Sequence, residues 1–202
     1  MMDQKLATAA RRLNARHHAR GVLPPLVLLT DRARLPDPLA AAAALPRGSL
    51  VVLRDGDLPA AARLVLGRAL SEVCRSRGLR LLVSGDAGLA RRIGAAGVHW
   101  PEKRLPMCVR GFATAAAHSQ KALMRARRAG VAAVFLSPVF PTASHPGAES
   151  LGPVRFAGLA RRAGMPVYAL GGVDGVTAPR LAGSGIVGVA AIGALGLEAI
   201  RP

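Results

Sequence analysis

The stretch Phe135–Ser144, which reads FLSPVFPTAS, joins a buried strand to a rigid turn that is rich in hydroxyl groups. The apolar run Val131–Leu136 is typical of a strand, and Ser137-Pro138 interrupts it. Two later segments, VYALGG at Val167–Gly172 and IVGVAAIGA at Ile186–Ala194, repeat this plan of an apolar strand that ends in small or polar residues. A chain that repeats it builds a ligand site from strand ends.

The rest of the chain alternates between strand and helix patterns. Apolar runs bounded by turn signals predict eight strands: Leu26–Leu29, Leu50–Leu53, Leu79–Val83, Val98–Trp100, Phe112–Ala117, Ala133–Val139, Val167–Leu170 and Ile186–Ile192. Helical patterns lie between most of them: Pro38–Leu45, Leu58–Ser76, Ala87–Gly94, Gln120–Arg128, Val154–Arg162 and Ala178–Ala182. This alternation predicts an α/β protein with right-handed βαβ units, and the apolar strands fit a parallel sheet that is covered on both faces. We therefore predict a compact (β/α)8 TIM barrel with short helices, with a doubly wound open sheet as the alternative.

The length of 202 residues predicts one domain with a substantial core. We place the barrel at residues 25–202 and assign residues 1–24 to a basic N-terminal helix or tail, which lacks the apolar stretch of a secretory signal. Two cysteines, Cys74 and Cys108, form no disulfide framework or metal site and fit a reducing cytoplasm.

The formal net charge of +17 is mostly arginine. Several arginine pairs lie one to three residues before a glycine, as expected where cations and a glycine cap end a helix: Arg75 and Arg77, Arg91 and Arg92, Arg127 and Arg128, and Arg161 and Arg162. The remaining charge favours small phosphorylated anionic substrates as partners. Aromatic residues make up only 3% of the chain, which argues against nucleic-acid binding, and we expect no membrane partner.

In a barrel, chemistry lies at the carboxyl ends of the strands. These ends carry Thr30-Asp31, Arg54-Asp55, Ser84-Gly85-Asp86, His99, His118, Ser137 to His145, Gly171-Gly172 and Gly193. The glycines at 171, 172 and 193 follow the last two strands, where barrels commonly bind phosphate through backbone N–H groups. Arg54 and His145 could add charge-assisted contacts. We expect His99 to be a hydrogen-bonded packing residue, and Asp57 to be the N-cap of the helix that follows it.

The strand-end motifs TD, LR, AGVH, SPVFPTAS, ALGGV and GVAAIGAL, in this order, are similar to those of the thiamine-phosphate synthase family, which includes thiazole tautomerases. The resemblance implies a (β/α)8 barrel that couples an aminopyrimidine methyl diphosphate to a thiazole phosphate with Mg²⁺. It implies that Arg54 binds the diphosphate, that Thr142 and Ser144 contact substrate, and that Gly172 lies at the thiazole phosphate. We add Ser84 and His118 as substrate-binding residues.

The chain departs from the family pattern where the metal would bind. Ser84-Gly85 stand where the resemblance implies Asn-Asp, and Arg104 stands where it implies an acidic Mg²⁺ ligand. Asp86 and Glu102 lie next to these positions and are the candidate metal ligands. His145 replaces a lysine, and Pro138 replaces the histidine of the tautomerase branch.

These residues predict a synthase-like enzyme of thiamine biosynthesis, a transferase in which Arg54 and His145 hold the diphosphate. One alternative is a non-catalytic or altered barrel that binds a thiamine precursor or another phosphate ester. Another is a thiazole phosphate isomerase with His118 or His145 as the proton shuttle. The sequence predicts no oligomeric state.

Overall fold

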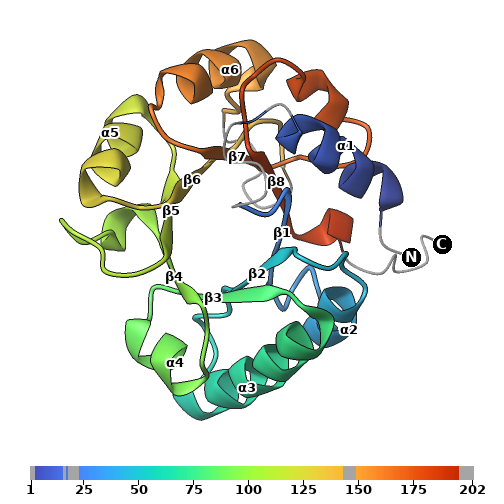
Figure 1. Ribbon diagram of the computed structural model, residues 1–202, viewed down its shortest axis with the longest axis vertical. Helices are drawn as coiled ribbons and strands as arrows, with labels where there is room; N and C mark the ends of the chain where they lie inside the picture. Colours follow the sequence, from blue (N-terminus) through green and yellow to red (C-terminus); the bar gives the residue numbers. More distant parts are fainter. Residues whose placement is uncertain (1–2, 16, 18–22, 143–148, 196–202) are drawn as a thin grey trace.

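Eight parallel strands form a closed barrel in a computed structural model that describes residues 3–15, 17, 23–142 and 149–195. The strands follow one another around the ring in chain order, so each pairs with its neighbours in sequence, and β8 pairs with β1 (Figure 1). Their bounds are β1 Leu26–Leu29, β2 Leu50–Leu53, β3 Arg80–Ser84, β4 Gly97–Trp100, β5 Ala113–Ala117, β6 Ala133–Leu136, β7 Val167–Leu170 and β8 Gly188–Ala191. The predicted (β/α)8 barrel is confirmed.

The helices surround this ring (Figure 1). The α-helices are α1 Gln4–Asn14, α2 Pro38–Ala43, α3 Ala60–Arg77, α4 Ala87–Arg92, α5 Gln120–Ala129 and α6 Gly152–Arg162. Single turns of 3₁₀-helix follow the other strands: η1 Glu102–Arg104, η2 Ala178–Leu181 and η3 Gly193–Leu195. The short helices predicted from the sequence are therefore found after β4, β7 and β8, where a single turn replaces a full helix.

Residues next to the helix ends determine where several helices begin and end. Gly78 and Gly130 adopt left-handed C-cap conformations with φ of 64° and 78°, and arginines occupy the last turns of α3 and α5. The prediction for Asp57 is wrong, because α3 begins after Pro59, which is its N-cap and makes no side-chain capping bond. A proline disfavours the helical conformation for the residue before it, here Leu58, so the helix begins two residues later than predicted.

Two predicted elements are also shorter than expected. The strand predicted at Ala133–Val139 ends at Leu136, because proline at position 138 has no N–H for the ladder. The extended segment beyond it still pairs with the end of β7, where Val139 N donates to Leu170 O at 3.0 Å. The helix predicted at Ala178–Ala182 is the single 3₁₀ turn η2.

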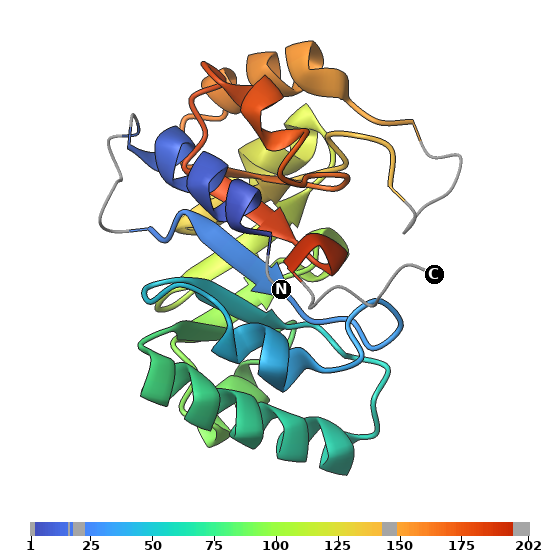
Figure 2. The ribbon, with the colours of Figure 1, turned by 90° about the vertical axis from the view of Figure 1, so that its right-hand side faces the viewer.

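Helix α1 covers the seam between β8 and β1 and packs on η2 (Figures 1 and 2). Asn14 near its end is buried and donates through Nδ2 to Val187 O at 2.7 Å. Asp3 caps its start by accepting from Leu6 N and also accepts from Gly175 N at 2.8 Å. The first helix of the chain therefore completes the outer layer beside the last strand. None of the helices in the described part of the chain is long and apolar enough to cross a membrane.

The barrel interior is filled by one cluster of side chains, and a larger cluster packs between the strands and the helices. Phe135 lies at the centre of an aromatic stack, with its ring centroid 4.6 Å from that of His99 and 5.1 Å from that of Tyr168. Tyr168 donates its hydroxyl to Pro24 O at 2.6 Å, and His99 Nδ1 lies 2.8 Å from Thr114 Oγ1. His99 is thus a buried packing residue with a hydrogen bond, as predicted.

Burial, with a smaller contribution from the positive charge of Arg54, lowers the pKa of His99 to about 3. Between pH 6.5 and pH 3 the unfolded chain binds a proton at this histidine and the folded chain does not. The free energy of unfolding should therefore fall as the pH drops through this window, with a contribution of up to about 1.4 kcal/mol per pH unit. Urea denaturation at several pH values should show a smaller slope for His99→Gln than for the wild type. Equal slopes for the two proteins would contradict a neutral buried imidazole.

Candidate active site at the carboxyl ends of the strands

The carboxyl ends of the eight strands meet at one edge of the barrel, which we call the strand-end rim. At the ends of β1 and β2 a buried hydroxyl organises the backbone. Thr30 Oγ1 accepts from Arg54 N at 2.9 Å and donates to the buried carboxylate of Asp55. The other oxygen of Asp55 accepts from Arg32 N at 3.0 Å. These bonds fix the point from which the side chain of Arg54 leaves the barrel.

Arg54 itself is held at the rim by its neighbour on β1. Its Nη2 forms an ion pair with Asp31 Oδ2, and its Nε lies 3.4 Å from Thr30 O. Arg34 contacts the same carboxylate at 2.6 Å. The hydrogen bond from Arg34 and the charges of both arginines hold the pKa of Asp31 below its ordinary value, although burial opposes them. Because 40% of the Arg54 side chain is exposed, its guanidinium remains accessible to a ligand.

The ends of β3 and β4 bring a second group of charges together. Arg63 from α3 donates through Nη2 to Ser84 O at 2.7 Å, and its Nη1 lies 3.4 Å from Asp86 Oδ2. Arg104, in the turn after β4, donates through Nη2 to Gly85 O at 2.8 Å. Two guanidinium groups thus bind successive carbonyl groups of one short loop.

Asp86 and Glu102, the predicted metal ligands, are both used by the protein itself. Asp86 is the N-cap of α4, with Oδ1 accepting from Leu89 N at 2.8 Å, and its other oxygen faces Arg63. Glu102 Oε2 accepts from His118 N at 2.9 Å. Throughout the described ranges, no three His, Cys, Asp or Glu residues lie close enough together to hold a metal ion. Mg²⁺ needs several oxygen ligands, and here each of the two carboxylates accepts from an N–H donor while the guanidinium groups of Arg63 and Arg104 lie against the same loop, so the described residues do not fit this ion.

His118 lies between β5 and β6. Its Nδ1 is 2.9 Å from Ser137 O and 3.2 Å from Ser137 Oγ. It also lines a pocket of about 340 Å³ between α5 and α6, together with Arg155 and Arg162. The structure therefore places the predicted His118 next to Ser137, at the edge of the rim.

The glycines predicted to bind phosphate differ in their surroundings. Gly171 and Gly172 have φ of 91° and 65°, and an added Cβ would lie 2.9 Å from Pro138 Cα and 2.7 Å from Phe140 Cβ, respectively. Both positions need glycine for conformation and for close packing on the segment after β6. Gly193 begins η3, and nothing lies within 4 Å of a Cβ added there. Thr142 lies half-buried after that segment, whereas Ser144 and His145 lie outside the described residues.

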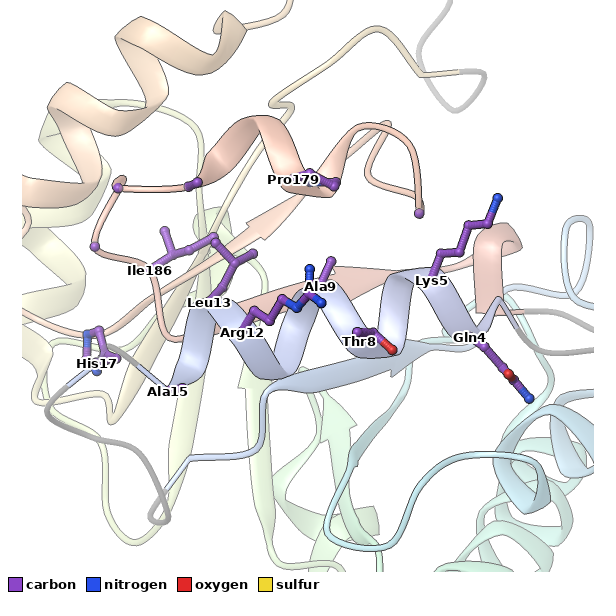
Figure 3. Close-up of a pocket in the computed structure, with 14 residues that line it drawn as sticks. Gln4, Lys5, Thr8, Ala9, Arg12, Leu13, Ala15, His17, Pro179 and Ile186 are labelled. Atoms are coloured by element: carbon purple, nitrogen blue, oxygen red, sulfur yellow. The ribbon is translucent and has the colours of Figure 1, made fainter.

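A cavity of about 1040 Å³ lies away from the rim, on the outside of the barrel. Figure 3 shows side chains of α1, among them Lys5, Arg12 and Leu13, beside Pro179 of η2 and Ile186. The residues that carry the strand-end motifs do not line this cavity, so we place the candidate site at the rim.

Several residues of the rim were not predicted as site residues. Asp31 and Asp55 follow directly after predicted strands, and this position was the only sign in the sequence that they belong to the site. Their bonds to Arg54 and Thr30 join two different strands, so the sequence alone does not predict them. Arg63 lies inside a helix with many arginines, and no pattern in the sequence distinguishes it.

The fold is a (β/α)8 barrel whose strand ends carry a basic candidate site. The profile of the family described as thiamine monophosphate synthase matches residues 26–195, and the chain belongs to that family. It is 34% identical over 173 residues to a thiamine-phosphate synthase of Methylococcus capsulatus, a match that covers 77% of this chain and 74% of that protein. It is 32% identical over 186 residues to one of Marinobacter nauticus, with 86% and 83% covered. The solved thiamine phosphate pyrophosphorylase of Pyrococcus furiosus has the same fold, with a TM-score of 0.75, 24% identity, and 87% and 89% of the two chains covered.

The hydroxyl of Thr30 is expected to stabilise the rim. Thr30→Val keeps the shape of the side chain but leaves Arg54 N and one oxygen of buried Asp55 without their partner. The free energy of unfolding should fall by about 1–3 kcal/mol, the cost of unsatisfied buried polar groups. Urea denaturation measures it, and Thr8→Val on the exposed face of α1 is the matched control, with an expected change within about 0.5 kcal/mol. Equal effects of the two substitutions would contradict this role.

Proposed function

We propose that the protein couples aminopyrimidine methyl diphosphate to thiazole phosphate and forms thiamine phosphate and inorganic diphosphate. Membership in the thiamine monophosphate synthase family supports this reaction. The observation that carries the proposal is the position of Arg54, an accessible guanidinium that Asp31 and Thr30 hold at the rim. Such a group can stabilise a departing diphosphate.

In this reaction the bond between the pyrimidine methylene carbon and a diphosphate oxygen breaks, and its electron pair leaves with the diphosphate. The lone pair of the thiazole nitrogen then forms the new C–N bond. Negative charge grows on the leaving group, so fixed positive groups near it lower the barrier. Arg54 suits this role because its backbone and its guanidinium are both fixed before the substrate arrives.

The thiazole phosphate would lie on the other side of the rim, at Gly171, Gly172 and Gly193. The backbone N–H groups in this region can donate to phosphate oxygens without a side chain in the way. Thr142 and Ser144 would orient the substrate, His145 would hold the diphosphate together with Arg54, and Ser84 and His118 would contact the substrate.

Enzymes of this family are generally Mg²⁺-dependent. In this chain the candidate ligands Asp86 and Glu102 are engaged by N–H donors.

Arg54→Gln should reduce kcat by about 10²–10³-fold, the effect of losing one preorganised donor to a developing charge. Thiamine phosphate can be measured by fluorescence after oxidation, with both substrates supplied. Arg68→Gln, which removes the same charge from an exposed position on α3, should leave the rate unchanged.

An Arg54→Gln variant as active as the wild type would remove the role assigned to Arg54. A wild-type protein that makes no product, beside a family member that works in the same assay, would instead support the non-catalytic or isomerase alternatives.

A further inference from the structure

The carbonyl groups at the end of β3 are the natural place for a cation in this rim. Ser84 O and Gly85 O are adjacent, and both face cationic side chains rather than other backbone groups. Arg63 occupies the first of them and Arg104 the second. These two carbonyl oxygens are therefore already bonded to guanidinium N–H groups.

Arg104 has the properties of an anion-binding residue. It is exposed, it is anchored by one of its five N–H donors, and within the described ranges no carboxylate forms an ion pair with it. The remaining donors form a planar fork that matches two oxygens of a phosphate group. A divalent cation bound beside it would be repelled by the guanidinium.

Arg63 lies mostly buried beside the loop that the guanidinium of Arg104 contacts. Only 12% of its side chain is exposed, and its Nε is a buried donor without a hydrogen-bond partner. Its one carboxylate partner, Asp86, is 3.4 Å away and also caps α4. Arg63 is therefore a fixed and incompletely neutralised positive charge beneath the loop that Arg104 contacts.

Arg54 adds a third positive group on the neighbouring strand. The register pairs Leu53 with Val83, so the residues that follow, Arg54 and Ser84, leave the sheet side by side. The guanidinium groups of Arg54, Arg63 and Arg104 thus lie around the ends of β2, β3 and β4. Arg54 pairs with Asp31, and Arg63 pairs with Asp86.

We propose that Arg104, supported by the buried charge of Arg63, takes the place of a divalent metal ion and binds the diphosphate of the substrate directly. The identity of that diphosphate ester rests on the proposed function. The anion site itself predicts that inorganic pyrophosphate binds to the folded protein without any divalent cation.

The first test is calorimetric titration of the full chain with inorganic pyrophosphate, in EDTA and again in Mg²⁺, with the free pyrophosphate corrected for its magnesium complex. Binding in EDTA that is within about tenfold of the affinity in Mg²⁺ is the expected result. An absence of binding in EDTA, or an affinity that Mg²⁺ raises by more than about tenfold, would overturn the proposal.

Variants show whether Arg104 is the group responsible. Arg104→Ala should weaken binding in EDTA by about tenfold or more, the scale of one charge-assisted contact, and Arg104→Lys should restore part of it. Arg68→Ala is the charge-matched control and should bind as the wild type does. Equal affinities of Arg104→Ala and Arg68→Ala would overturn the assignment.

A pair of glycine variants tests the same group without removing its charge. A Cβ at Gly85 would lie 2.9 Å from Arg104 Nη1, whereas nothing lies within 4 Å of a Cβ at Gly94, and both residues have φ of 65°. Gly85→Ala and Gly94→Ala therefore impose the same backbone strain, but only the first displaces the guanidinium. We expect weaker pyrophosphate binding for Gly85→Ala alone, with circular dichroism as the check that both variants fold.

The same preparations separate this proposal from the proposed function. Thiamine phosphate that forms only when Mg²⁺ is present would preserve the synthase activity and overturn the role of Arg104. Pyrophosphate binding in EDTA that depends on Arg104, without any thiamine phosphate formed, would preserve the anion site and overturn the synthase activity.

Discussion

The pairing of β1 with β8 is the constraint on which the site depends. It requires the two backbones to come so close that a Cβ at Gly188 would collide with the carbonyl oxygen of Pro25, and Val189 N donates to that oxygen at 2.9 Å. Only glycine permits this approach at position 188. Once the ring is closed, all eight parallel strands end at the same rim, and residues distant in the sequence become neighbours.

The large positive charge of this chain consists of two populations with different roles. The arginine pairs in the last turns of α3, α4, α5 and α6 lie at the amino ends of the strands, because each helix runs back along the barrel, and they stabilise the helix ends. Arg54, Arg63 and Arg104 belong to the opposite end. In this second group Arg54 and Arg104 are exposed, and Arg63 is a mostly buried charge behind them, an arrangement that suits an anionic ligand.

The sequence predicted the barrel well because its signals are local. Apolar runs, glycines after arginine pairs and the order of the strand-end motifs each depend on a few adjacent residues. The end of β6 was predicted too late because composition alone continued the apolar run through Pro138. The site was less accessible to prediction, since its contacts join separate strands: Thr30 bonds to Asp55, and Arg63 reaches Ser84 from a helix. Arg104 was visible as a departure from the family pattern, but its bond to Gly85 O became visible only in three dimensions.

Helix α1 adds a consequence for the synthesis of the chain. It is made before all eight strands, yet it packs against β8, η2 and the loop at Gly175, which come near the end of the described chain. The strand beside it, β1, likewise finds one of its two partners only in β8. Domains generally fold as units, in order of synthesis. Here α1 and one edge of β1 cannot make these contacts until residue 191 has left the ribosome, so the apolar side of α1 lacks its native partners during most of translation.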